Sequence, residues 1–147
     1  MLGERRRAFR CMSAETLLRA PGNRAGSVES MGQDVLIVIN DAPYGTEKAY
    51  NALRLAIALQ ARGNSVKIFL MADGVFCGLP RQELPPGYYN INEMLGRVLS
   101  KGGRVAACGS CMKARGLAVE GLVKGVEQGS MAVLSEWTEG CSKTHSF

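Results

Sequence analysis

The five residues Val35-Leu-Ile-Val-Ile39 form an unbroken apolar run in which four positions are β-branched. A run of this length and composition is typical of a strand that is buried on both faces of a parallel sheet. The segment Asn40-Asp-Ala-Pro-Tyr-Gly45 ends the strand, and apolar residues then recur at helical spacing from Thr46 to Arg62. Thr46 is suited to cap the start of this helix, and Gly63 occupies the place of a helix C-cap glycine.

The alternation of strands and helices continues along the chain. We expect, in this order, a strand at Ser65–Met71, a helix at Asn90–Lys101 and a strand at Arg104–Ala107. Further on, Ser130 is suited to cap a short helix, and Ser142–Phe147 to form a closing edge strand. This order predicts a single-domain, three-layer α/β fold with a mostly parallel sheet of about five strands and right-handed crossovers.

Composition favours one globular domain. The 147 residues are 46% hydrophobic and 21% charged, and no apolar stretch is long enough to span a membrane. The net charge of +5 is concentrated in residues 1–30, where six arginines face three glutamates, so the rest of the chain has 12 basic and 10 acidic residues. Because that part also lacks a basic stripe with interleaved aromatic residues, we expect neither nucleic acid nor membrane as a partner.

Residues 1–30 are rich in arginine and in helix breakers, and they show no sustained apolar periodicity. We interpret them as a disordered extension ahead of a domain at residues 31–147. Met31 resembles a natural start, so the extension is read as an upstream start or a cloning remnant. No signal-peptide-like apolar segment is present, and the cysteine count of five is odd, so a reducing cytoplasm is expected.

Candidate site residues cluster after the predicted strands. Ligands of open α/β sheets bind at the carboxyl ends of the strands. The three loops that leave these ends are Asn40–Gly45, Ala72–Tyr88 and Cys108–Cys111. We therefore expect one edge of the sheet to gather Asp41, Tyr44, Asp73, Cys77, Cys108 and Cys111, with the two aspartates acting as turn and cap residues rather than as acid–base groups.

Cys108 has the sequence setting of a reactive thiol. It ends a buried strand, and Gly109-Ser110 leaves room for backbone amides to point at its sulfur. A helical turn that starts here would stabilise a thiolate, as would the positive charges of Lys113 and Arg115. The thiolate is the form that attacks sulfur. Spacing alone also allows a buried cysteine that only packs.

Two segments resemble the DsrE/DsrF-like family of sulfur-relay proteins. They are Asp73-Gly-Val-Phe76 and Val105–Gly116, in which Cys108 precedes the pair Arg115-Gly116 by seven residues. The resemblance covers roughly residues 32–147. It implies a small α/β fold, assembly into homotrimers or homohexamers, and a persulfide on Cys108. Cys111 is an addition relative to sulfurtransferase subunits of this family.

The resemblance makes sulfur transfer or sulfur carriage the leading expectation, with sulfur donor and acceptor proteins or small thiols as partners and no cofactor or metal. One alternative is a thiol–disulfide oxidoreductase that uses Cys108 and Cys111. The other is a module that binds a soft metal or another ligand, with Cys77 as a third thiolate. Only His145 could supply imidazole, and its place near the end of the sequence makes a pairing with Cys108 unexpected.

The supporting residues have two interpretations each. Cys77 is a second sulfur carrier or an inert loop cysteine. Arg115 steadies an anionic sulfur species or pairs with a carboxylate such as Glu120, and Tyr44 lines the pocket or packs. The apolar loop Val75–Tyr89 is expected to cover the site and to pack against a neighbouring subunit.

Overall fold

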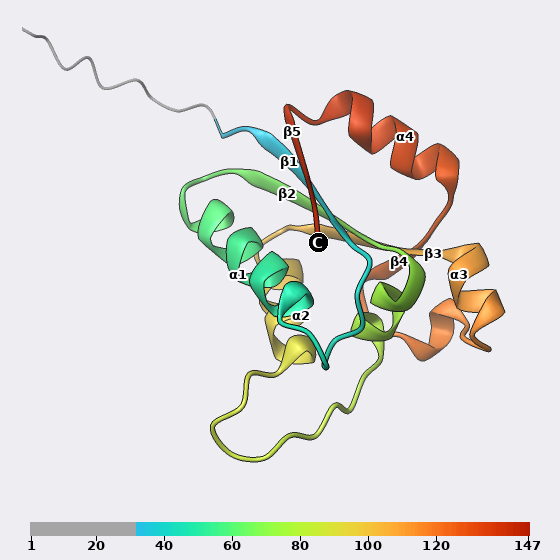
Figure 1. Ribbon diagram of the computed structural model, residues 1–147. Helices are drawn as coiled ribbons and strands as arrows, with labels where there is room; N and C mark the ends of the chain where they lie inside the picture. Colours follow the sequence, from blue (N-terminus) through green and yellow to red (C-terminus); the bar gives the residue numbers. More distant parts are fainter. Residues whose placement is uncertain (1–31) are drawn as a thin grey trace, which may run out of the picture.

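All strand pairings in the sheet are parallel, and the strands lie in the order β4-β3-β2-β1-β5 (Figure 1). This computed structural model describes residues 32–147, so the expectation for residues 1–30 lies outside it. The strands are β1 (Asp34–Ile39), β2 (Ser65–Leu70), β3 (Arg104–Cys108), β4 (Val126–Gly129) and β5 (Lys143–Ser146).

Helices cover both faces of this sheet (Figure 1). α1 (Lys48–Ala61) and α2 (Ile91–Ser100) pack together on one face, and α4 (Met131–Gly140) lies on the other. On the α4 side, the Trp137 ring meets the Phe69 ring edge to face, with centroids 6.2 Å apart. The predicted three-layer α/β fold with a parallel sheet of about five strands is therefore confirmed.

The chain order explains the strand order. β1, β2, β3 and β4 add to the sheet one after another in a single direction. α4 then carries the chain back across the opposite face to β5, which pairs with the free side of β1. No helix among residues 32–147 is both long enough and apolar enough to cross a membrane.

Of the three expected helix caps, two are confirmed and one is wrong. Gly63 follows α1 in the left-handed region at φ +82°, as a C-cap glycine does. The N-cap prediction was wrong: α1 begins at Lys48, so Glu47 rather than Thr46 occupies the N-cap position, and no side chain caps the helix. The Thr46 hydroxyl instead donates to the Asp41 carboxylate at 2.9 Å. Ser130 caps α4 as expected and accepts a hydrogen bond from the Val133 amide.

Four short elements escaped the sequence analysis. They are the 3-10 helix η2 (Ala72–Gly78), α3 (Gly109–Ala114), the 3-10 helix η3 (Val119–Gly121) and β4. β4 reads Val-Glu-Gln-Gly and so lacks an apolar run. It is held by pairing with β3 and by the close approach of Gly129 to the Phe69 ring, where a Cβ would lie 2.7 Å from a ring carbon.

η2 is locked against the end of β1. The Gly74 amide hydrogen lies between the carbonyls of Asn40 and Met71, with N···O distances of 3.0 and 2.8 Å. A Cβ at position 74 would lie 2.0 Å from the Ile39 carbonyl oxygen, so only glycine fits here without backbone movement. This contact fixes where the chain that follows β2 meets the chain that follows β1.

We expect Gly74→Ala to lower the free energy of unfolding by about 1–3 kcal/mol, because the added methyl group overpacks a backbone contact. Gly96→Ala is the matched control, since a Cβ at position 96 has no atom within 4 Å and lies inside α2. That change should stabilise the protein by about 0.5–1 kcal/mol. Urea unfolding measures both, and equal stabilities for the two variants would contradict the assigned contact.

Candidate functional site

Cys108 is both the last residue of β3 and the N-cap residue of α3. Its sulfur accepts a hydrogen bond from the Cys111 amide at 3.3 Å and lies 3.3 Å from the Ser110 hydroxyl oxygen. The residue is only 8% exposed. The Cys108 sulfur therefore lies at the end of the sheet, beside the Cys111 amide and the Ser110 hydroxyl, and only a small part of the residue is exposed to solvent.

Gly109 lets the first turn of α3 lie close to β4. A Cβ on Gly109 would lie 3.1 Å from the side-chain nitrogen of Gln128 and 3.3 Å from the Gly129 carbonyl oxygen, which is tighter than ordinary packing. Cys108 and Gly129 are register partners in the β3–β4 pairing, so this contact is immediately beside the sulfur. Gly109 thus has a steric role in forming the turn that brings Ser110 and Cys111 to Cys108.

The two cysteines of this turn differ in proton affinity. Burial raises the pKa of Cys108, but hydrogen bonds from the side chains and amides of Cys111 and Ser110 outweigh it, so the pKa is lowered. The pKa of Cys111 is raised by burial and by its hydrogen bond to Cys108, while the Ala72 amide and the Arg115 charge act in the opposite sense. Of the two thiols, Cys108 is therefore the one that loses its proton more readily.

Arg115 pairs with a carboxylate, but not with Glu120 as suggested. Its guanidinium contacts Asp73 on η2, with Nε and Nη2 at 2.9 and 2.7 Å from the same carboxylate oxygen, Oδ1. Its Nη1 also donates to the Cys111 carbonyl oxygen at 3.1 Å. Arg115 therefore joins η2 to α3. This pairing could not be predicted from a local pattern, since Asp73 and Arg115 are 42 positions apart.

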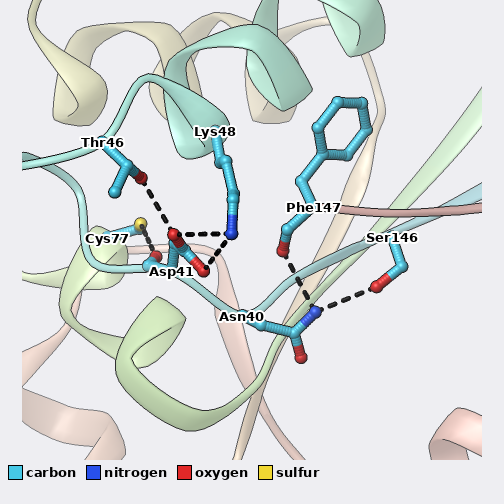
Figure 2. Close-up of polar contacts among 7 residues, drawn as sticks. All are labelled: Asn40, Asp41, Thr46, Lys48, Cys77, Ser146 and Phe147. Atoms are coloured by element: carbon cyan, nitrogen blue, oxygen red, sulfur yellow. Dashed lines mark hydrogen bonds and ion pairs between the residues drawn. The ribbon is translucent and has the colours of Figure 1, made fainter.

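Cys77 lies on η2, and its side chain is directed at the loop that follows β1. Its thiol is fully buried and donates to the Asp41 carbonyl oxygen at 3.7 Å (Figure 2). Burial raises the pKa of this thiol to about 12, so it stays protonated at neutral pH. Cys77 therefore packs beneath the end of β1 as a buried, protonated thiol, which favours the inert of its two interpretations.

The loop after β1 is held by its own polar contacts (Figure 2). The Asp41 carboxylate accepts from Thr46 and forms an ion pair with Lys48 at 3.2 Å, and these two partners lower its pKa. The Asn40 side chain donates to the Ser146 hydroxyl at 2.9 Å and to the Phe147 carbonyl at 3.0 Å. Asp41 is thus a turn residue, as expected.

Tyr44 packs rather than contacting the cysteines. Its hydroxyl donates to the Gln82 side chain at 2.7 Å and accepts from the Ile91 amide at 3.3 Å. Its ring stacks on Tyr89, which in turn stacks on Tyr50 with centroids 4.1 Å apart. Tyr44 therefore anchors the long loop ahead of α2, and the pocket-lining interpretation finds no support in these contacts.

The remaining candidate groups are remote from Cys108. His145 lies on β5, separated from β3 by β1 and β2. Across residues 32–147, no three His, Cys, Asp or Glu side chains are grouped so that they could hold a metal ion. The structure thus brings together Cys108, Gly109, Ser110, Cys111 and Arg115. Asp73, which was expected at this edge as a turn or cap residue, instead forms the ion pair with Arg115. The Ala72 amide, to which the sequence analysis gave no role, acts on the pKa of Cys111.

Comparisons with known proteins support the resemblance to the DsrE/DsrF-like family. A model of the DsrE/DsrF-like family matches residues 33–144. An uncharacterized protein of Methanopyrus kandleri is 46% identical over 109 residues, which are 74% of this chain and 89% of the other. Protein YchN of Escherichia coli K12 is 39% identical over 117 residues, which are 78% and 99% of the two chains.

Solved structures confirm the fold. The crystal structure of the Escherichia coli YchN protein superposes with a TM-score of 0.73, covering 78% of this chain and 99% of that one. A Methanobacterium thermoautotrophicum protein, MTH1491, is 20% identical with a TM-score of 0.59 over 76% and 96% of the two chains, which is a likeness of fold alone. With the family model spanning nearly the whole described domain, the chain belongs to the DsrE/DsrF-like family.

Proposed function

We propose that this protein carries sulfane sulfur as a persulfide on Cys108. The observation that carries the proposal is the hydrogen bonding of the Cys108 sulfur, which accepts from the Cys111 amide and neighbours the Ser110 hydroxyl. These contacts lower the pKa of Cys108 and so favour the nucleophilic thiolate. Membership of the DsrE/DsrF-like family supports the same reading.

Sulfur transfer through this site balances without a cofactor. The Cys108 thiolate attacks the outer sulfur of a donor persulfide, the donor's S–S bond breaks, and the donor leaves as a thiolate. The outer sulfur, with its proton, is now bonded to Cys108. Delivery repeats the exchange: an acceptor thiolate attacks that sulfur, and Cys108 leaves as a thiolate. A thiol of low pKa leaves faster, so the same hydrogen bonds assist both steps.

Cys111 favours a second candidate function, that of a redox couple. Cys111 lies in the same helical turn as Cys108, and its amide donates to the Cys108 sulfur at 3.3 Å. In this alternative, the deprotonated Cys111 attacks the inner sulfur of a Cys108 persulfide, which forms a Cys108–Cys111 disulfide and releases hydrosulfide. Because Cys111 holds its proton more tightly than Cys108, the resting arrangement favours carriage over this release.

We further propose donor and acceptor proteins or small thiols as partners, in a reducing, cytoplasmic compartment. The described cysteines support that compartment, since Cys77, Cys108, Cys111 and Cys141 are all unpaired. No nucleic acid or membrane is part of the proposal.

A homo-oligomer is also proposed, with the face formed by α1 and α2 in contact with a neighbouring copy. A groove of about 790 Å³ lies between these helices and is lined by Tyr50, Arg54, Met94 and Arg97 among others. Tyr88, from the loop ahead of α2, borders the groove and is 69% exposed. Tyrosine, arginine and methionine are the residues that interfaces between proteins favour.

Alkylation by iodoacetamide should follow the proton affinities of the thiols. We expect the rate at Cys108 to reach half its maximum at a pH below about 8.5, the ordinary thiol pKa. Cys77 should resist modification until the protein unfolds, since it is buried and its pKa is raised to about 12. Peptide mapping assigns the sites, and Cys108→Ser is the control. A midpoint at or above 8.5 at Cys108 would contradict the thiolate assignment.

Intact-mass spectrometry after incubation with glutathione persulfide tests carriage directly. The wild-type protein should gain about 32 Da per sulfur atom, reversibly with a thiol reductant, and Cys111→Ser should gain it too. Cys108→Ser should gain nothing. A loss of about 2 Da that requires both cysteines would instead support the redox couple. Absence of any adduct on the wild-type protein would refute carriage.

Light scattering at micromolar concentration tests the oligomer. The wild-type protein should have the mass of three or six chains, and Tyr88→Arg should lower it by placing a charge in the interface. Met131→Arg is the matched control, because Met131 is similarly exposed, at 67%, and lies on the opposite side of the sheet in α4. A monomeric wild-type protein, or an equal effect of both variants, would overturn the assigned interface.

A further inference from the structure

Arg115 connects the segment that follows β2 with the segment that follows β3. Its guanidinium holds the Asp73 carboxylate through Nε and Nη2, and it donates from Nη1 to the Cys111 carbonyl oxygen at 3.1 Å. The planar fork of an arginine is suited to join two acceptors in a fixed relative position. The Arg115 side chain is 27% exposed, so this contact is partly shielded from water.

Cys111 is held on both sides of its backbone. Its amide donates to the Cys108 sulfur at 3.3 Å, and its carbonyl oxygen accepts from Arg115. α3 contains only six residues, so it has few helical hydrogen bonds of its own to keep this residue in place. The contact with Arg115 therefore contributes to the orientation of the Cys111 amide, which donates to the Cys108 sulfur.

η2 supplies the fixed side of this connection. Ala72 begins η2 in the left-handed region at φ +50°, a conformation that is unfavourable for a residue with a Cβ. Such strain persists only where the surroundings impose it, and it is frequent next to functional groups. Gly74 pins the same segment to the end of β1.

We propose that Asp73 and Arg115 are positioning residues, which clamp Cys111 so that its amide faces the Cys108 sulfur. The inference deepens the proposed function and rests on it, because it concerns the same thiolate. Neither residue need touch the sulfur that is transferred. When the clamp is opened, the donors to Cys108 lose their alignment, the thiolate loses stabilisation, and sulfur is accepted more slowly.

The decisive variant is Asp73→Ala, read out as the pH dependence of Cys108 alkylation by iodoacetamide. Removal of a nearby negative charge would by itself favour the thiolate and move the midpoint to lower pH. Loss of positioning moves it to higher pH, so the two effects have opposite signs. We expect an upward shift and a rate at pH 7 lower by about 3–10-fold, since the thiolate fraction falls about tenfold per pKa unit.

Glu127→Ala is the matched control. It opens the ion pair between Glu127 and Arg104, whose 3.0 Å contact lies at the opposite end of β3, and the Glu127 and Asp73 side chains are 53% and 58% exposed. Its alkylation profile should coincide with that of the wild type. Arg115→Lys should fall between the wild type and Asp73→Ala, because lysine restores the charge but cannot hold both acceptors.

An unchanged or lowered midpoint in Asp73→Ala, with the urea unfolding transition intact, would overturn the clamp. The mass gain from glutathione persulfide, measured on the same samples, separates the two proposals. If the wild type takes up sulfur and Asp73→Ala keeps the wild-type pH profile, the clamp is wrong and carriage stands. If Asp73→Ala shifts the profile but the wild type takes up no sulfur, the clamp is correct and carriage fails.

Discussion

The parallel pairing of β1, β2 and β3 brings the carboxyl ends of these strands to the same edge of the sheet, and the candidate site depends on that convergence. The segment that follows each strand has a different role at this edge. The chain after β3 forms the turn that carries Cys108, and the chain after β2 forms η2. The chain after β1 supplies the carbonyl oxygens against which η2 is packed. In an antiparallel sheet, neighbouring strands would deliver these segments to opposite ends.

At Cys108, burial and hydrogen bonding act on the pKa of the thiol in opposite directions. Burial disfavours the charged form of a thiol, as Cys77 demonstrates with its pKa of about 12. Cys108 is also classed among the buried residues, yet its pKa is lowered, because hydrogen-bond donors converge on its sulfur. The two thiols therefore differ both in burial and in the number of donors around the sulfur, and both differences make Cys108 the more acidic of the two.

Much of this arrangement could be predicted from the sequence, because it is encoded in local patterns. The apolar run at Val35–Ile39 and the helical periodicity in the residues up to the end of α2 were sufficient to predict β1, α1, β2, α2 and β3. Cys108 stood out because it directly follows a buried strand. β4 and η2 could not be predicted, since β4 has only four residues with two exposed side chains, and η2 is stabilised by a backbone contact at Gly74. The partner of Arg115 was missed because ion pairing between distant segments leaves no periodic signal.

The strand order has a consequence for how the domain is made. β1 pairs on one side with β2, close in sequence, but on its other side with β5, about a hundred positions later: Val35 is the register partner of Lys143. A chain emerging from the ribosome can assemble β1 to β4 as it grows, while the second edge of its most apolar strand stays unpaired until β5 has been synthesised. An open edge of that kind invites pairing with other nascent chains. β5, a polar strand whose four side chains are all exposed, is synthesised last and forms the edge strand that ends the sheet beside β1.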